Sequence, residues 1–267
     1  SGIGLCVAEG LFKRGYRVFA TARKQEDVKI LLNKGMESFQ LDLDDSISIK
    51  RAVDTVLNKT EGKLFALFNN GGFGQPGAVE DLTRDVLREQ FETNVFGYLE
   101  LTNLILPTMR RQGYGRIIQN SSILGFISLP FRGAYNASKH ALEGLSDTLR
   151  MELRGTNIYV SIIEPGPIEA KFRQNAYAKY KENIDAKSSH FHKKYEAMEE
   201  RLTKETAPLP FTLPATAVLE KVLQALENSK PKARYYVTFP TYLFVGLKRL
   251  LPGFLLEKLL IRAGTLG

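Results

Sequence analysis

The sequence contains a single cysteine, Cys6, among 267 residues, so no disulfide framework can form within the chain. A protein without disulfides fits a reducing compartment, and we expect a cytoplasmic location with Cys6 packed in the core. No stretch resembles a signal peptide, and no apolar run reaches the ~20 residues that a membrane-spanning helix requires. The longest candidate, residues 241–261, is interrupted by Lys248, Arg249, Pro252 and Gly253.

The net charge of +8 is spread along the chain and forms only one short cluster, at residues 192–194. A basic excess is compatible with a nucleic acid, a membrane surface or an anionic cofactor. Because arginine is not interleaved with aromatic residues, the sequence predicts no nucleic-acid partner. The pair His190 and His192 has a spacing compatible with a metal site, but no acidic residue or cysteine accompanies it. We therefore expect a solvated lid there and no bound metal.

Short apolar segments alternate with stretches of helical periodicity along most of the chain. Several of these segments are apolar almost throughout, which is typical of strands covered on both faces. We expect strands at residues 16–22, 38–43, 64–70, 115–122 and 158–166. We expect helices at residues 2–14, 25–33, 46–59, 83–111 and 133–155. This alternation predicts an α/β fold in which one doubly wound parallel sheet lies between two helical layers, as a three-layer sandwich.

No repeat or low-complexity linker divides the chain, so we expect residues 1–267 to form a single domain. Residues 167–213 are polar, charged and long for a connection, which is typical of a binding loop or lid. Residues 231–267 predict a short strand and then an apolar helical tail, residues 241–267. In the tail, apolar side chains at helical spacing are flanked by basic residues, which is compatible with a membrane surface. A cover for a pocket or a subunit interface is favoured over lipid. The apolar residues are Leu243, Leu247, Leu250 and Phe254.

The chain opens on Ser-Gly-Ile-Gly and passes directly into a helical pattern. Gly2 and Gly4 resemble the last glycines of a dinucleotide-binding loop, which would place the backbone of Gly2, Ile3 and Gly4 against a pyrophosphate at a helix N-terminus. In such a fold a strand and an earlier glycine come before these residues. Because the sequence shows neither, we expect either a chain that lacks its first strand or another role for the glycines.

The segment 121–153 places Tyr135 and Lys139 four residues apart on a predicted helix, so both side chains share one helical face. A phenol has a pKa of about 10, and a cationic neighbour stabilises the phenolate and lowers that pKa. We therefore expect Lys139 to lower the pKa of Tyr135, so that Tyr135 can exchange a proton with a carbonyl oxygen. Ser122 ends a predicted strand, where its hydroxyl can hold the same oxygen.

Ser122 together with Tyr-Asn-Ala-Ser-Lys (135–139) resembles the active-site motif of the short-chain dehydrogenase/reductase family. Four further motifs of that family occur in family order: Ser-Gly-Ile-Gly (1–4), Asn-Asn-Gly-Gly (69–72), Asn-Val-Phe-Gly (94–97) and Pro-Gly-Pro-Ile (165–168). A lone Y-x-x-x-K is weak, whereas this ordered set over about 240 residues is specific. The whole chain is similar to the branch of 17-beta-hydroxysteroid dehydrogenase type 1, retinol dehydrogenases and bacterial NADP-dependent aldehyde reductases. The resemblance implies a Rossmann-type fold.

By this resemblance Tyr135 is the catalytic acid-base, Lys139 lowers its pKa and binds the nicotinamide ribose, and Ser122 orients the substrate carbonyl. Asn94 holds a water molecule in a proton relay through Lys139. The resemblance also implies a set of cofactor-binding residues: Gly2, Ile3, Gly4, Arg23, Asp42, Asn69, Gly71, Tyr135, Lys139, Pro165, Gly166 and Ile168. If the resemblance misleads, Tyr135 and Lys139 are an ordinary helix pair and Ser122 caps a strand.

The segment after the strand expected at 16–22 indicates which dinucleotide is bound. An NAD site usually carries an acidic residue there, against the ribose hydroxyls. Residues 19–24 contain no acid and carry Arg23, whose guanidinium suits a 2′-phosphate, so we expect NADP(H) rather than NAD(H). Asp42 resembles the residue that contacts adenine, although a polar strand end explains it nearly as well. Ala170 stands where the family usually has a threonine, so one hydrogen bond to the cofactor is expected to be missing.

The predicted pocket wall is apolar and aromatic, and consists of Phe73, Ile123, Leu124, Phe126 and Phe131. It suggests a hydrophobic aldehyde, ketone or steroid-like substrate, while core packing explains each residue singly about as well. We expect reduction of such a carbonyl, or oxidation of the matching alcohol, in a homodimer or homotetramer that pairs through the long helices. The alternative is a non-enzymatic dinucleotide sensor or an inactive fragment that kept the fold. An epimerase or dehydratase would normally need a longer C-terminal domain.

Overall fold

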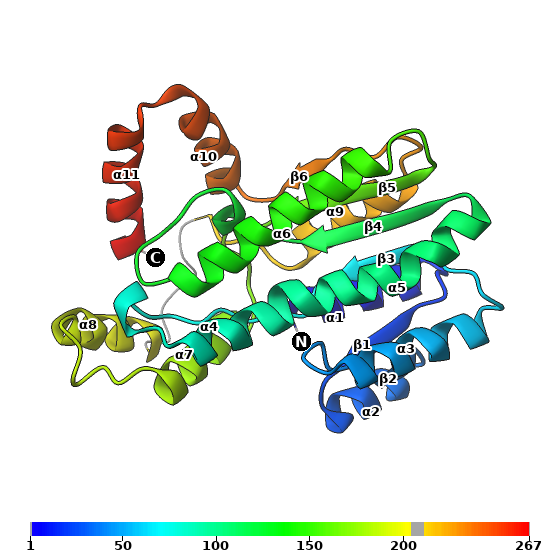
Figure 1. The fold of residues 1–267 in the computed structure, drawn as a ribbon, viewed down its shortest axis with the longest axis horizontal. Coiled ribbons are helices and arrows are strands. Elements are labelled where there is room, and N and C mark those ends of the chain that lie inside the picture. Colours follow the sequence, from blue (N-terminus) through cyan, green and yellow to red (C-terminus); the bar gives the residue numbers. More distant parts are fainter. Residues whose placement is uncertain (1, 204–210, 267) are drawn as a thin grey trace.

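The computed structural model describes residues 2–203 and 211–266, and Figure 1 shows its arrangement. All strand pairs in the described residues are parallel. The strands are β1 (Phe19–Ala22), β2 (Glu37–Gln40), β3 (Ala66–Asn69), β4 (Gly115–Asn120), β5 (Ile158–Glu164) and β6 (Arg234–Tyr236). β1 pairs with β2 in one sheet, while the other sheet has the order β3-β4-β5-β6. The parallel α/β fold predicted from the alternation is therefore confirmed.

Helices cover both faces of the larger sheet, as a buried parallel sheet requires. The helices are α1 (Gly2–Lys13), α2 (Gln25–Asn33), α3 (Ser46–Lys59), α4 (Arg84–Phe91), α5 (Gly97–Gln112), α6 (Gly133–Glu152), α7 (Phe172–Asn183), α8 (His192–Thr203), α9 (Thr216–Glu227), α10 (Phe239–Leu250) and α11 (Gly253–Leu266). Ile117 of β4 packs in a core with α3, α5 and α6. Its neighbour Ile118 packs in a second core with α1 and α9, because successive side chains of a strand point to opposite faces. These two cores separate the three layers.

The sheet is interrupted between β1 and β3, which are not paired with each other. A Rossmann sheet has the strand order 3-2-1-4-5-6, so its first strand lies between the strands that correspond here to β1 and β3. The interruption therefore falls where the expected first strand belongs. Gly2, at the start of α1, adopts a left-handed φ of 59° that favours glycine.

One predicted helix is divided in the structure. Residues 83–111 form α4, then the π-helical turn Glu92–Phe96, and then α5. A π-turn inserts one extra residue into a helix and often marks a functional position, and Asn94 lies within this one. Residue-level periodicity does not distinguish such a turn from an ordinary helix, which is why the sequence predicted one continuous element.

The C-terminal third departs most from the expectations. The predicted lid, residues 167–213, holds the two helices α7 and α8, and its residues 204–210 lie outside the described residues. Helix α9 was not predicted. The apolar tail forms two helices, α10 and α11, because Pro252 disfavours a helical conformation at Leu251. Leu243 and Phe254 therefore do not share one helical stripe. Within the described residues, no helix is long and apolar enough to cross a membrane.

Two tyrosine side chains anchor α7 and α8 to the rest of the fold. Tyr180 and Tyr195 are fully buried and pack together with Ala78 and Ile184. The Tyr195 hydroxyl accepts a hydrogen bond from the Ala78 amide at 2.7 Å and donates one to Asp81 at 2.6 Å. The side chains of this segment are therefore anchored through specific contacts, and α7 begins beside the predicted catalytic residues.

Candidate active site

The end of β4 and the start of α6 bring two hydroxyl groups together. Ser122 follows β4 and caps the short helical turn Ile123–Gly125, where its Oγ accepts a hydrogen bond from the Leu124 amide at 3.1 Å. Tyr135 lies in the first turn of α6, and the Ser122 side chain is near enough to act on the pKa of its hydroxyl and lower it. The two hydroxyl groups thus lie near each other at the carboxyl end of the sheet, where ligands bind in open α/β folds.

Lys139 extends from the same face of α6 as Tyr135, as the four-residue spacing predicts. Its Nζ donates a hydrogen bond to the Asn120 carbonyl at the end of β4, at 2.8 Å. The same atom lies 5.7 Å from the centre of the Tyr135 ring and 5.6 Å from that of Tyr98 on α5. Only 4% of Lys139 is exposed, so its amine is enclosed between α5, α6 and β4.

Burial determines the ionisation of both groups. Burial raises the pKa of Tyr135 to about 12, although the neighbouring Ser122 side chain and the charge of Arg132 act in the opposite direction. Burial lowers the pKa of Lys139 to about 8, against the influence of Glu143. The expectation that Lys139 produces a net decrease in the pKa of Tyr135 is therefore wrong for this structure, because enclosure of the phenol outweighs nearby positive charge. Tyr135 is consequently a neutral hydroxyl at pH 7.

Asn94 is fully buried on the π-turn and connects three segments. Its Oδ1 accepts a hydrogen bond from the Phe73 amide at 3.2 Å, and its Nδ2 donates to the Phe73 carbonyl at 3.0 Å. The same Nδ2 donates to Ser138 Oγ at 3.2 Å, and Ser138 in turn donates to the Tyr135 carbonyl. Asn94 therefore ties the loop after β3 to the first turns of α6, one residue before Lys139.

An aromatic side chain that the sequence analysis did not single out covers Tyr135. The ring of Phe172, at the start of α7, lies 5.3 Å from the ring of Tyr135. A Cβ on Gly74 would lie 2.7 Å from Phe172, so only glycine leaves room for this packing. Phe172 could not have been found by spacing, because it approaches Tyr135 through the tertiary fold.

The start of α1 lies against two other predicted cofactor segments. A Cβ on Gly2 would lie 3.1 Å from the Cβ of Ala170, and a Cβ on Gly4 would lie 2.6 Å from Nδ2 of Asn70. Asn70 accepts a hydrogen bond from the Asn120 side chain at 2.9 Å. The helix N-terminus, with no side chain at Gly2 or Gly4, has the form of an anion site that fits a pyrophosphate.

The loop after β5 is held close to Ser122. The Pro165 carbonyl accepts a hydrogen bond from the Ile123 amide at 2.8 Å. A Cβ on Gly166 would lie 2.1 Å from Oγ1 of Thr238, so the backbone packs there against β6 and α10. Gly71 is similarly restricted, because its Cβ would lie 3.0 Å from Leu43.

Several predicted cofactor residues are used differently in the structure. The Asn69 side chain is buried and donates to Thr102 and Gln119, so it braces the sheet, and its neighbour Asn70 faces Gly4 instead. Ile3 and Ile168 pack their side chains against the core, which leaves only their backbone atoms for a ligand. The cofactor roles of these three residues stay predictions, and for Ile3 the predicted contact is made by the backbone.

Two polar candidates lie at the ends of the smaller sheet. Arg23 follows β1 and is exposed, and its carbonyl accepts a hydrogen bond from Gln40 at 2.9 Å. Asp42 is half-buried, and its Oδ1 accepts a hydrogen bond from the Asp44 amide at 3.2 Å. The Asp42 carboxylate thus contributes to a local turn, while the Arg23 guanidinium faces solvent.

Among the five residues of the predicted pocket wall, Phe131 lines a cleft that the other four do not line. Phe131 packs edge-to-face on Phe191 and Tyr195, and it lines a largely apolar cleft of about 610 Å³ between α11 and the start of α6. The other four predicted residues do not line this cleft. Leu124 is buried. Cys6 is only half-buried, not part of a closed core as expected, and the described residues contain no cluster of three or more histidine, cysteine, aspartate or glutamate side chains arranged to hold a metal.

Comparison with known proteins places these features in a family. The family model for short chain dehydrogenases matches residues 1–181. The chain is 42% identical to oxidoreductase YbbO of Escherichia coli over 260 residues, which are 97% of this chain and 90% of that protein. It is 32% identical to the NADPH-dependent 3-dehydrocapnine reductase of Ornithobacterium rhinotracheale over 268 residues, covering 97% of this chain and 92% of the reductase.

A human relative and a solved structure extend the comparison. The chain is 33% identical to 17-beta-hydroxysteroid dehydrogenase type 1 of Homo sapiens over 253 residues, covering 89% of this chain and 75% of that protein. The crystal structure of an actinorhodin polyketide ketoreductase variant with NADPH superposes with a TM-score of 0.72 at 27% identity, covering 89% of this chain and 92% of that one. The fold, the ordered motifs and these similarities lead to one conclusion. The chain belongs to the short-chain dehydrogenase family and is an oxidoreductase of the branch related to 17-beta-hydroxysteroid dehydrogenase type 1.

Proposed function

We propose that the chain is an NADP(H)-dependent reductase of hydrophobic aldehydes or ketones, with Tyr135 as its proton donor. The observation that carries this proposal is the position of the Tyr135 hydroxyl, near the Ser122 side chain and beside the buried amine of Lys139. When the carbonyl carbon accepts a hydride, the carbonyl oxygen becomes strongly basic and needs an acid beside it. The neutral Tyr135 hydroxyl is such an acid, and its raised pKa suits proton donation better than proton abstraction.

The position of each residue determines its role in the proposed reaction. Ser122 holds the substrate oxygen, and Tyr135 delivers its proton to that oxygen. The phenolate that remains on Tyr135 is stabilised by the cationic amine of Lys139, 5.7 Å from the ring centre. Asn94 holds the first turns of α6 against the loop after β3, through Ser138 and Phe73. The water-mediated relay through Asn94 and Lys139 is part of the same proposal.

The residues at the start of α1 fit a dinucleotide, because glycines expose the helix N-terminus to a pyrophosphate. When bound, NADPH supplies the hydride. Gly2 and Gly4 would hold the pyrophosphate, Lys139 the nicotinamide ribose, and Pro165 and Gly166 the nicotinamide. The exposed Arg23 would bind the 2′-phosphate, and the NADPH named for the capnine reductase and the ketoreductase supports this choice.

The chemistry around Tyr135 favours an apolar substrate. Phe172 covers its ring, and the loop from Ser122 to Gly133 leads to the apolar cleft beside α11. Lining residues of this cleft include Leu129, Pro130, Phe131 and Leu256. A hydrophobic carbonyl compound fits these surroundings, and the steroid and capnine substrates named for two relatives are compatible with this class.

The proposed enzyme is a cytoplasmic homodimer or homotetramer. Helices α5 and α6 flank a small groove of about 180 Å³. Leu99 and Leu145 in this groove are about two-fifths exposed, as expected of side chains that a second subunit covers. The single half-buried cysteine is compatible with a reducing compartment.

The proposal is tested by mixing the purified chain with NADPH and a series of hydrophobic aldehydes and ketones, and following the absorbance of the reduced nicotinamide. We expect turnover in the wild type and a loss of at least about 100-fold in Tyr135→Phe, because a positioned acid typically contributes 10²–10⁴-fold. Tyr177→Phe, an exchange on α7 outside the proposed machinery, is the matched control and should retain activity. Binding of NADPH without any turnover would instead support the dinucleotide sensor.

A further inference from the structure

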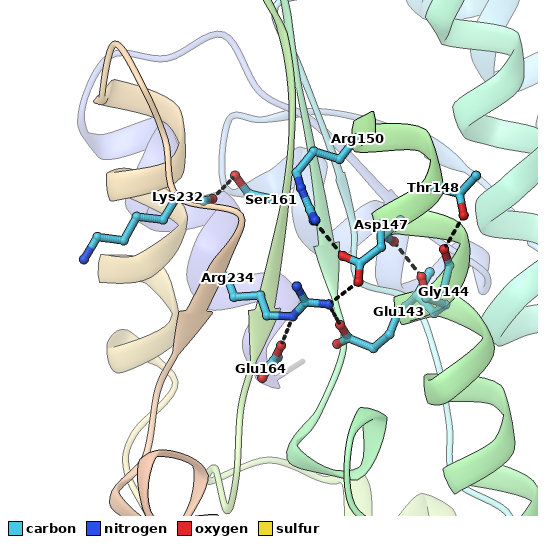
Figure 2. Close-up of polar contacts among 11 residues, drawn as sticks. Glu143, Gly144, Asp147, Thr148, Arg150, Ser161, Glu164, Lys232 and Arg234 are labelled. Atoms are coloured by element: carbon cyan, nitrogen blue, oxygen red, sulfur yellow. Dashed lines mark hydrogen bonds and ion pairs between the residues drawn. The ribbon is translucent and has the colours of Figure 1, made fainter. Parts of the chain in front are cut away.

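One arginine connects three carboxylates behind the candidate active site (Figure 2). Arg234 on β6 lies 3.0 Å from Glu143 Oε2 and 2.7 Å from Asp147 Oδ2, both through Nη2. Its Nε lies 3.0 Å from Oε1 of Glu164, the last residue of β5. Asp147 also accepts a hydrogen bond from Arg150 at 2.6 Å. Arg234 thus joins α6 to the strand that leads into the loop of Pro165.

Glu143 lies one helical turn after Lys139 on α6, so their Cβ atoms are about 6 Å apart. Lys139 is held at the end of β4, where the Asn120 carbonyl accepts a hydrogen bond from its Nζ. The Ser121 hydroxyl and Oε1 of Glu143 are buried without a hydrogen-bond partner among the described residues, and both lie close to Gly125. Lys139 and Glu143 are therefore enclosed beside the same strand end.

The Glu143 carboxylate is enclosed, whereas Asp147 is not. The side chain of Glu143 is 10% exposed and that of Asp147 is 35% exposed. A Cβ on Gly125 would lie 3.0 Å from Oε1 of Glu143, so the turn after Ser122 closes over the carboxylate. A charge in this position is poorly screened by water and acts strongly on its neighbours.

Among the described residues, the titratable and polar groups that face Lys139 and Glu143 come from several elements. Lys139 faces Tyr135 on its own helix, Tyr98 on α5, the Asn120 carbonyl on β4, and Glu143. The groups that face Glu143 come from four elements: Ser121, Asp147, Glu164, Arg234 and Tyr236. Of the four groups named as facing Lys139, Glu143 supplies the carboxylate.

We propose that Glu143 is the counter-ion of the buried Lys139 ammonium, and that it is thereby a positioning residue for proton transfer at Tyr135. Arg234 holds the carboxylate in place and stabilises its charge against burial, which raises the pKa of Glu143. The proposal concerns the same site as the proposed reductase and rests on it for the role of Tyr135. The pairing of Glu143 with Lys139 can be measured without cofactor or substrate.

The measurement is the free energy of unfolding of the cofactor-free chain, determined by urea denaturation between about pH 6 and about pH 9. Glu143→Gln removes the counter-ion, which lowers the pKa of Lys139 further, by about one unit or more for an opposite charge at this distance. The loss of stability in Glu143→Gln is then greatest near pH 6, where Lys139 is charged in both proteins. It shrinks about tenfold in the unfolding constant per pH unit up to about pH 8, where Lys139 becomes neutral in both.

Two comparisons separate this effect from simple disruption of the Arg234 contacts. Asp147→Asn also removes a carboxylate from Arg234, but it lies two turns from Lys139. Glu143 and Asp147 both raise the pKa of Glu164, so each variant has some pH dependence through Glu164. In a Lys139→Met background, the pH dependence of the loss caused by Glu143→Gln should decrease, whereas that of Asp147→Asn should stay the same. If Glu143→Gln does not fold, Glu143→Asp withdraws the carboxylate from Lys139 and should show a smaller change in the same direction. A pH-independent loss, or a loss unchanged by Lys139→Met, would overturn the proposal.

Activity gives a second readout once turnover is established. For alcohol oxidation with NADP⁺, removal of an anion lowers the apparent pKa of the coupled Tyr135 and Lys139 pair. The rising limb of kcat/KM against pH should move to lower pH by about one unit in Glu143→Gln and stay in place in Asp147→Asn. Absence of turnover in the wild type would contradict the proposed reaction, whereas the unfolding experiment would still decide the pairing.

Discussion

Gly166 is a position where one added methyl group should measurably destabilise the fold. Its φ lies outside the left-handed region, so alanine is acceptable to the backbone. An added Cβ, however, would lie 2.1 Å from Oγ1 of Thr238 and 3.0 Å from Oγ1 of Thr241. Both threonines are fully buried, and their hydroxyls are 3.1 Å apart in a shared hydrogen bond. The clash therefore falls on two side chains that have little room to move.

The cost follows from these contacts. Overpacking by one methyl group typically costs about 1–3 kcal/mol. Displacement of Thr238 also breaks its hydrogen bond to Thr241, which adds about 1 kcal/mol. We expect Gly166→Ala to lower the free energy of unfolding by about 3 kcal/mol, and to weaken NADPH binding, because the loop from Pro165 to Ile168 would shift.

Urea denaturation measures this change, with Gly144→Ala as the matched control. Gly144 lies inside α6, and a Cβ there would meet no atom within 4 Å. Alanine at that position should stabilise the helix by about 0.5–1 kcal/mol. Thr238→Ala should relieve most of the clash, so that adding Gly166→Ala to Thr238→Ala costs about 1 kcal/mol or less. A Gly166→Ala protein as stable as the wild type would refute the steric reasoning.

Two further predictions concern charged groups. Arg23→Ala should weaken NADPH binding by about 10–100-fold while NADH binding stays unchanged, because only NADPH carries the 2′-phosphate; titration of both nucleotides checks this, and an equal loss for both would contradict it. Glu164→Gln tests the buried carboxyl group of Glu164, which lies beside Arg234. Burial raises the pKa of this carboxyl group to about 8 from 4.5. A raised folded-state pKa contributes stability that is present below about pH 4.5 and is lost as pH rises through about 8. The wild type should therefore lose stability over this range more steeply than Glu164→Gln, and equal slopes in the melting temperature would exclude the assignment.

The local sequence pattern was sufficient to predict most of the helices and strands and to place the motifs on them. The helices expected at 25–33 and 46–59 have those bounds in the structure, because their periodicity, and for the second helix the Asp45 cap, are properties of the segments themselves. The four-residue spacing likewise placed Tyr135 and Lys139 on one helical face. The break at Pro252 was readable from the sequence but was not applied to the tail, which is why one helix was expected there.

Tertiary structure decided the properties that depend on many distant segments at once. The pKa of Tyr135 rises because α5, α6, β4 and Phe172 together restrict the access of water to this half-buried side chain, and no single segment encodes that restriction. Asn69 and Asn70 are identical in type and adjacent, yet successive side chains of an extended segment point in opposite directions, so that one braces the sheet and the other faces Gly4.

The contact between Arg234 and Glu143 spans 91 positions of the sequence. The sequence by itself determined which residues stand in each helix and strand, because those choices follow from local hydrogen bonding and periodicity. Only the folded chain determined which charges face each other and how much water reaches them, because both are sums over residues that chain connectivity does not bring together.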